Sequence, residues 1–86
     1  MPVLNLYTTL GCHLCDEAAA MVSKQRVLNL NLALVEISES EILLGNYGVR
    51  IPVLKFQDGT AELAWPFTDE ELSTFLASSL LEITEN

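Results

Sequence analysis

The chain has 86 residues, half of them hydrophobic, and a formal net charge of −8. This length suits a single domain spanning residues 1–86, with one buried core. The acidic balance excludes a nucleic-acid-binding protein, which needs a basic face, and disfavours binding to anionic membranes. No apolar stretch is long enough to span a membrane, and the N-terminus lacks a secretory signal. The expected location is therefore the cytoplasm.

The first half of the chain predicts a strand, a helix and a second strand. Residues 3–8 have the composition of a buried strand, and residues 32–37 predict another. Between them, residues 16–28 predict a helix. Its buried face is predicted from small and apolar residues that recur with helical spacing, namely Cys15, Ala18, Ala19 and Val22. Because this helix links the strands, they are expected to be parallel, with a right-handed crossover.

The second half predicts a short helix followed by a β-hairpin. The sequence Ser38-Glu39-Ser40-Glu41 matches a capping box, which opens a helix ending near residues 45–46. Residues 53–57 and 61–65 predict strands on either side of Asp58-Gly59, a pair typical of tight hairpin turns.

A second capping box, Thr68-Asp69-Glu70-Glu71, opens the final helix, and residues 82–86 are expected to form a frayed tail. The element order is therefore βαβ, helix, β-hairpin, helix. An α/β domain with a four-stranded mixed sheet and helices on both faces accounts for this order. Four aromatic side chains are expected to serve in packing, namely Tyr7, Tyr47, Trp65 and Phe67.

The chain has two cysteines, and they lie three residues apart in Cys12-His13-Leu14-Cys15, between the first strand and the first helix. A helix N-terminus offers unpaired N–H groups and the positive end of the dipole, which favour a thiolate. A disulfide this short closes too small a loop to brace the fold, so its purpose would be chemical. In a reducing compartment such a pair indicates catalysis or metal binding. We predict that Cys12 is a redox nucleophile and Cys15 its resolving partner.

Two neighbours are expected to adjust the reactivity of Cys12. A protonated His13 would lower the pKa of Cys12, whereas the carboxylate of Asp16 would raise it, each by less than about one unit at an exposed site. The helix N-terminus is expected to prevail and to give a moderately lowered pKa. Both residues also fit a simpler interpretation, with His13 as a surface residue and Asp16 as an ordinary first-turn acid.

The chain resembles the glutaredoxin branch of the thioredoxin superfamily, and more narrowly the small bacterial glutaredoxin-like proteins. The segments that carry the resemblance are Leu6-Tyr7-Thr8, Gly11-Cys12-His13-Leu14-Cys15-Asp16-Glu17 and Tyr47-Gly48-Val49-Arg50-Ile51-Pro52-Val53-Leu54. The resemblance implies a thioredoxin-like fold with strand order 2-1-3-4, in which the last two strands are antiparallel to their neighbours. It also implies a cis peptide bond before Pro52, facing the cysteines.

The resemblance implies a thiol-disulfide oxidoreductase that reduces protein disulfides or glutathione mixed disulfides. Glutathione would be a co-substrate, with no other cofactor, and the chain would act as a monomer. The implied substrate contacts are the backbone of Ile51 beside Pro52 and the helix N-terminus at Thr68 and Asp69. Arg50, a lone arginine in a loop, is expected either to bind a carboxylate of glutathione or of a partner, or to be solvated or paired at the surface. The chain departs from the family pattern in lacking a lysine before the cysteine motif and in having large aromatics before the last helix.

Two other functions stay open. One Cys-x-x-Cys supplies two thiolates, whereas a structural zinc site needs four ligands, so no metal site is assigned within the chain. A zinc or iron–sulfur site on Cys12, shared across a dimer, remains an alternative. The other alternative is a redox-inactive adaptor that binds a partner protein through the same fold.

Overall fold

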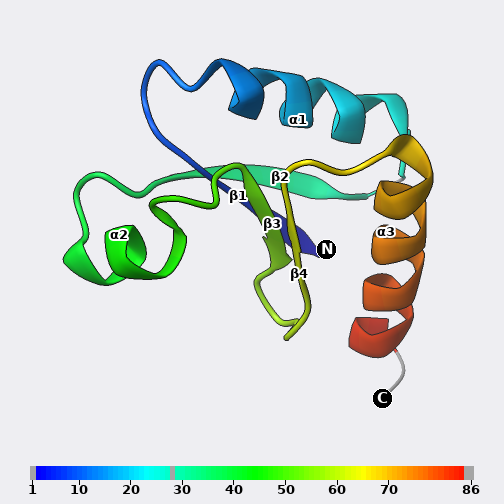
Figure 1. The fold of residues 1–86 in the computed structure, drawn as a ribbon. Coiled ribbons are helices and arrows are strands. Elements are labelled where there is room, and N and C mark those ends of the chain that lie inside the picture. The colour runs from blue at the N-terminus through cyan, green and yellow to red at the C-terminus, as the bar shows by residue number, and fades with distance from the viewer. Residues whose placement is uncertain (1, 28, 85–86) are drawn as a thin grey trace.

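The computed structural model describes residues 2–27 and 29–84. These residues form strands and helices in the predicted order (Figure 1). The elements are β1 (Val3–Thr8), α1 (His13–Lys24), β2 (Asn31–Glu36), α2 (Glu41–Tyr47), β3 (Val53–Phe56), β4 (Glu62–Ala64) and α3 (Asp69–Thr84). In this described part of the chain, no helix is long and apolar enough to cross a bilayer.

The strands form one mixed sheet with the order β2-β1-β3-β4. Strands β1 and β2 run parallel, as the helical crossover between them predicts. Strand β3 is antiparallel to β1, and β4 is antiparallel to β3. The predicted strand order and directions are therefore confirmed, and β1 lies in the middle of the sheet with the cysteine motif at its C-terminal end.

Helices cover both faces of the sheet, with α1 and α3 on one side and α2 on the other (Figure 1). Successive side chains of a strand point to opposite faces, so Leu4 and Leu6 lie on the α1 side and Tyr7 on the α2 side. The larger core cluster lies under α1 and α3. Its buried members are Leu4, Leu6, Ala18, Val22, Leu54, Phe56, Phe67, Leu72, Phe75 and Leu76.

The α2 side has a smaller core built around two stacked tyrosines. The rings of Tyr7 and Tyr47 lie 4.0 Å apart, and both side chains are buried, which confirms their packing role. The Tyr47 hydroxyl donates a hydrogen bond of 2.9 Å to the Glu62 carboxylate. Burial and this bond raise the pKa of Tyr47 above its ordinary value. The short helix α2 is thus attached to β1 by stacking and to β4 by a hydrogen bond.

The first two helices each begin at a residue other than the predicted one. Helix α1 begins at His13, because the Cys12 side chain caps it, and ends at Lys24; Leu28, its predicted end, lies outside the described residues. Helix α2 is capped by Ser40, whose hydroxyl accepts the Leu43 N–H at 3.2 Å, and not by Ser38. The Ser38 N–H is bonded to Glu36 instead, which leaves the cap to the later serine.

The hairpin and the last helix also differ in length from the prediction. Strand β3 ends at Phe56 and β4 begins at Glu62, so the Asp58-Gly59 pair lies inside a longer loop. Neither residue has the positive φ that a two-residue primed turn requires. Helix α3 continues to Thr84, three residues into the segment expected to fray, because Leu80 and Ile83 pack against the larger core. Residues 85 and 86 lie outside the described residues.

Candidate functional site

The cysteine motif leaves the C-terminal end of β1 through a tight loop. Gly11 has a φ of 80°, in the left-handed region that glycine adopts without strain. The Cys12 N–H donates to the Thr9 carbonyl at 3.1 Å and closes the turn. Cys12 is half-buried, whereas Cys15, in the first turn of α1, is only 3% exposed. Cys12 is therefore more accessible to solvent than Cys15, and this difference is the one predicted for a nucleophile and its resolving partner.

Cys12 and Cys15 form a disulfide, with their Cα atoms 5.3 Å apart. The Cys15 N–H also donates to the Cys12 sulfur at 3.2 Å, which makes Cys12 the N-cap of α1. An N-terminal N–H group and the helix dipole both favour negative charge at this position, by about 0.3–1 kcal/mol for the dipole. In the reduced protein, the same contact would stabilise a thiolate on Cys12.

The carboxylate of Glu36 anchors the loop that presents Cys12. It accepts the Leu10 N–H and the Ser38 N–H, each at 2.9 Å. The Ser38 N–H, followed by the Thr9 hydroxyl, lowers the pKa of Glu36. Sequence reasoning missed this residue. The available signal was its place opposite Thr8 in a parallel register, because a polar side chain at that strand end must lie beside the cysteine loop.

A cavity of about 320 Å³ lies beside Cys12. Asp16 lines this cavity from the first turn of α1, so the structure brings one predicted neighbour to the nucleophile. His13 is the first residue of α1 and is exposed. The residues that line the cavity are Thr8, Thr9, Leu10, Gly11, Cys12, Asp16, Leu34 and Glu36.

Pro52 lies at the same edge of the sheet as the cysteine loop. Val53 pairs with Tyr7 across β1 and β3, which places Pro52 level with the end of β1. The Ile51–Pro52 peptide bond is cis, and Pro52 is buried. The Ile51 N–H donates to the Tyr47 carbonyl at 3.1 Å, so this N–H is engaged within the chain. A backbone contact between Ile51 and a substrate would therefore use its carbonyl oxygen.

Arg50 is held by contacts within the chain. Its Nη1 donates to a Glu62 carboxylate oxygen at 3.1 Å, and its Nε and Nη2 donate to the Asn46 carbonyl at 3.1 and 2.9 Å. The guanidinium also lies 5.2 Å from the centre of the Tyr47 ring. Binding of a substrate carboxylate by Arg50 stays a prediction. The guanidinium would have to bind that carboxylate and Glu62 together, or break its salt bridge with Glu62.

Thr68 and Asp69 lie at the other end of α1 from Cys12. The Gln25 side chain, at the C-cap of α1, donates to the Asp69 carbonyl at 3.3 Å. Figure 1 shows the chain crossing from β4 to α3, whose first turn lies beside the C-terminal end of α1. A helix of the length of α1 spans about 18 Å. The structure therefore does not bring Thr68 and Asp69 to the cysteines.

The aromatic segment before α3 explains this separation. Phe67 is buried in the larger core cluster, and Trp65 packs edge-on against it with ring centres 5.1 Å apart. The packing role predicted for Phe67 is confirmed. The Trp65–Pro66 peptide bond is also cis, which sequence reasoning did not anticipate. Because Phe67 is buried in this core, the segment between β4 and α3 runs across it, and α3 begins beside the C-terminal end of α1, away from the cysteine loop.

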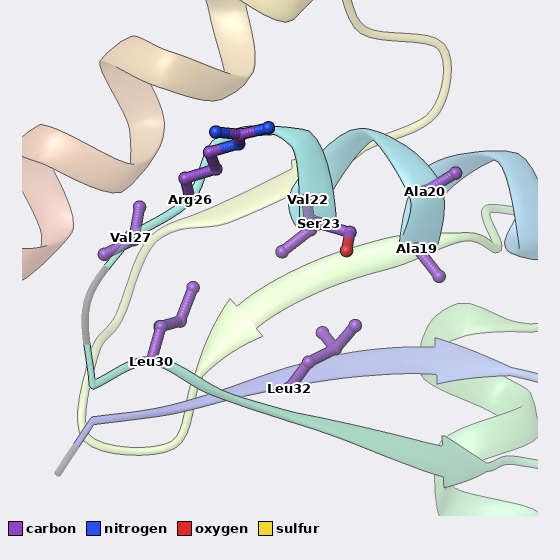
Figure 2. Close-up of a pocket in the computed structure, with 8 residues that line it drawn as sticks. All are labelled: Ala19, Ala20, Val22, Ser23, Arg26, Val27, Leu30 and Leu32. Carbon is purple, nitrogen blue, oxygen red and sulfur yellow. The ribbon is translucent and has the colours of Figure 1, made fainter.

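A second hollow, of about 550 Å³, lies at the C-terminal end of α1 (Figure 2). Ala19 and Val22 point from α1 toward Leu30 and Leu32, while Arg26 lies on the outer side of the helix end. The side chains described around it include no cysteine, histidine or carboxylate. The smaller cavity beside Cys12 is therefore the candidate redox site.

The fold and the Cys-x-x-Cys pair at the start of α1 define a protein of the thioredoxin fold with a redox-type site. The chain matches the model of the Glutaredoxin-like domain (DUF836) family over residues 3–77 and belongs to that family. It is similar to the X-ray structure of the structural-genomics target protein XcR50 from X. campestris, at 36% identity and a TM-score of 0.77. That match covers 87% of this chain and 96% of the other. No curated protein matches the chain in sequence.

Proposed function

We propose that this protein is a thiol-disulfide oxidoreductase, with Cys12 as the nucleophile and Cys15 as the resolving cysteine. One observation carries the proposal. Cys12 is partly exposed, its sulfur caps α1, and it is bonded to a Cys15 that is almost fully buried one turn further on. This asymmetry in access suits a pair in which one sulfur meets the substrate and the other reacts only within the chain.

The reaction begins with the reduced protein. The Cys12 thiolate, held by the Cys15 N–H, attacks one sulfur of the substrate disulfide and expels the other sulfur as a thiolate. Cys15 then loses its proton and attacks the Cys12 sulfur, which releases the second substrate sulfur. The substrate gains two electrons and two protons, and the protein is left with the Cys12–Cys15 disulfide. The reverse sequence oxidises a dithiol substrate.

Neighbouring groups would orient the substrate and adjust the rate. His13 follows Cys12 in the chain and Asp16 lines the cavity beside it, so a protonated His13 would stabilise the Cys12 thiolate and the Asp16 carboxylate would oppose it. The Ile51 carbonyl and the buried Pro52 lie at the same sheet edge and would align the backbone next to the substrate disulfide. Glutathione remains a candidate co-substrate, although Thr68 and Asp69, expected to seat it, lie at the far end of α1.

Three forms of the protein test the proposal in an insulin disulfide reduction assay. The wild type is expected to turn over, whereas Cys12→Ser should fall to the uncatalysed rate because it lacks the attacking sulfur. Cys15→Ser should lose turnover but accumulate a mixed disulfide on Cys12, which mass spectrometry of the Cys12 peptide detects. In cell extract, the same Cys15→Ser variant should retain its physiological partner as a stable adduct.

A wild type as inactive as Cys12→Ser would contradict the proposal and favour the redox-inactive adaptor. The cluster alternative has its own measurement, which is iron and zinc analysis of the protein as isolated. Among the described residues, no three histidine, cysteine, aspartate or glutamate side chains gather into a group that could hold a metal. A bound cluster would therefore have to draw ligands from a second copy or from glutathione.

A further inference from the structure

Resting on the redox function above, we propose that the cavity beside Cys12 selects the substrate. It is a subsite for a protein segment that carries a large apolar residue next to its reactive cysteine and a lysine or arginine beyond that residue. A mixed disulfide holds the partner's cysteine against the Cys12 sulfur, at the side of the cavity. The residues that flank the partner's cysteine must then lie against the surface around Cys12, and the cavity is part of that surface.

The walls of the cavity supply the apolar contact. Leu10, in the loop before Cys12, is 92% exposed, and Leu34, on β2, is 66% exposed. Leu34 pairs with Leu6 in parallel register, so its side chain lies on the α1 side of the sheet. Because α1 packs on the central strands, it leaves this part of the edge strand uncovered. Two large exposed leucines beside a nucleophile indicate a contact surface for an apolar side chain.

The polar part of the lining is acidic. Asp16 and Glu36 both line the cavity, and each carries a carboxylate at neutral pH. The exposed His13 adjoins Cys12 at the helix start. An acidic rim attracts lysine or arginine and repels the carboxylates of glutathione.

The four basic side chains do not neutralise this rim. Lys24 ends α1, and Arg26 lies on the outer side of the same helix end (Figure 2). Arg50 is paired with Glu62, and the Lys55 ammonium donates to the Phe56 carbonyl at 3.3 Å. The net charge of −8 adds a long-range attraction for basic partners.

Matched peptide disulfides isolate the contribution of the cavity. Each peptide cysteine is linked to thionitrobenzoate, and the Cys15→Ser variant is used so that a single step occurs. The Cys12 thiolate attacks the peptide sulfur, the sulfur–sulfur bond breaks, and thionitrobenzoate leaves as a coloured thiolate. The four peptides carry leucine or serine beside the cysteine and lysine or glutamate beyond it. Each rate is divided by that of free mercaptoethanol with the same peptide, which removes intrinsic differences in reactivity.

We expect the leucine–lysine peptide to react about tenfold faster than the serine–glutamate peptide at low ionic strength. Added salt should shrink the lysine advantage, since it is electrostatic, and should leave the leucine advantage in place. Leu34→Ser should reduce the leucine advantage, since only Leu10 then remains in the apolar wall, and Asp16→Asn should reduce the lysine advantage. Ile42→Ser, at a residue 75% exposed on α2, is the matched control and should leave the leucine and lysine advantages unchanged.

The outcomes separate this inference from the function on which it rests. Equal normalised rates for all four peptides, or a faster reaction with the thionitrobenzoate disulfide of glutathione, would overturn the subsite and leave the oxidoreductase standing. An unchanged leucine advantage in Leu34→Ser would also overturn it. Failure of the wild type to reduce even bis(hydroxyethyl) disulfide, a small neutral substrate that needs no subsite, would instead remove the redox function.

Discussion

At the scale of single residues, one carboxylate fixes the loop from which the nucleophile projects. The Glu36 carboxylate accepts hydrogen bonds from two backbone N–H groups, that of Leu10 in the cysteine loop and that of Ser38 after β2. These bonds are stronger to the ionised carboxylate than to the protonated group, so they lower the pKa of Glu36 below its ordinary value. The stabilisation is therefore fully present above the ordinary carboxylate pKa and is lost as the pH falls through the lowered value.

Glu36→Gln should make the protein less stable at neutral pH and less sensitive to acid. The wild type should lose more unfolding free energy than the variant between about pH 6 and about pH 3, because protonation of Glu36 weakens charge-assisted bonds that a neutral glutamine cannot form. Urea unfolding at a series of pH values measures the difference. Glu39→Gln, which removes the same charge from a nearby exposed glutamate, is the control. Parallel pH profiles for wild type and Glu36→Gln would refute the anchoring role.

At the scale of elements, the last helix has a complete capping box. The Thr68 hydroxyl accepts the Glu71 N–H at 3.0 Å, and the Glu71 carboxylate accepts the Thr68 N–H at 2.9 Å. Two unpaired donors at the start of α3 are thus satisfied reciprocally. The sequence predicted this box correctly, and its place beside the C-terminal end of α1 makes it a structural feature of the α1–α3 layer.

Thr68→Ala should lower the unfolding free energy by about 1 kcal/mol, the usual cost of losing an N-cap side chain. Chemical denaturation measures this change. Thr74→Ala, at an exposed position inside α3, makes the same substitution where alanine is the better helix former, so it should not destabilise. Equal stability of Thr68→Ala and wild type would mean that α3 is held by its buried face alone.

The sequence predicted most elements because their patterns are local. The run from Val3 to Thr8 predicted β1 with its observed bounds, and the parallel pairing followed from the helical crossover. The start of α1 was missed because cysteine is not a usual N-cap, yet Cys12 serves as one here. The cap of α2 was misassigned because the choice between Ser38 and Ser40 depends on Glu36, which takes the Ser38 N–H.

The candidate site was predicted in part. The cysteine motif located Cys12 and Cys15 and their unequal exposure. The contribution of β2 was missed, because the positions of Leu34 and Glu36 depend on strand register and on the strip of sheet that α1 leaves uncovered. The position of α3 could not be predicted from the sequence either, because it depends on where the Phe67 side chain packs in the core.

At the scale of the whole molecule, negative charge is in large excess. Twelve aspartates and glutamates face four lysines and arginines, and the salt bridge identified in the described residues joins Arg50 to Glu62. Self-repulsion among like charges opposes the compact state, and salt screens it. The same field attracts basic partners, so stability and partner binding should respond to salt in opposite directions.

Raising sodium chloride from about 20 mM to about 200 mM should therefore raise the Tm by a few degrees. Differential scanning calorimetry at neutral pH measures the shift. A variant with Glu39→Lys and Glu70→Lys, both at exposed positions, should show a smaller rise because its net charge is smaller in magnitude. A Tm that falls with salt would show that favourable ion pairs outweigh the repulsion.

The outer position of β2 has a practical consequence for handling the protein. This strand forms one side of the sheet and carries the exposed Leu34, so it offers a template onto which a second copy could add a strand. At neutral pH, the net charge of −8 opposes such association, but the isoelectric point of the sequence is about 4.2. An acid titration passes through that point, where strand addition between molecules competes with unfolding. Measurements in this range should therefore be made in dilute solution and checked by light scattering.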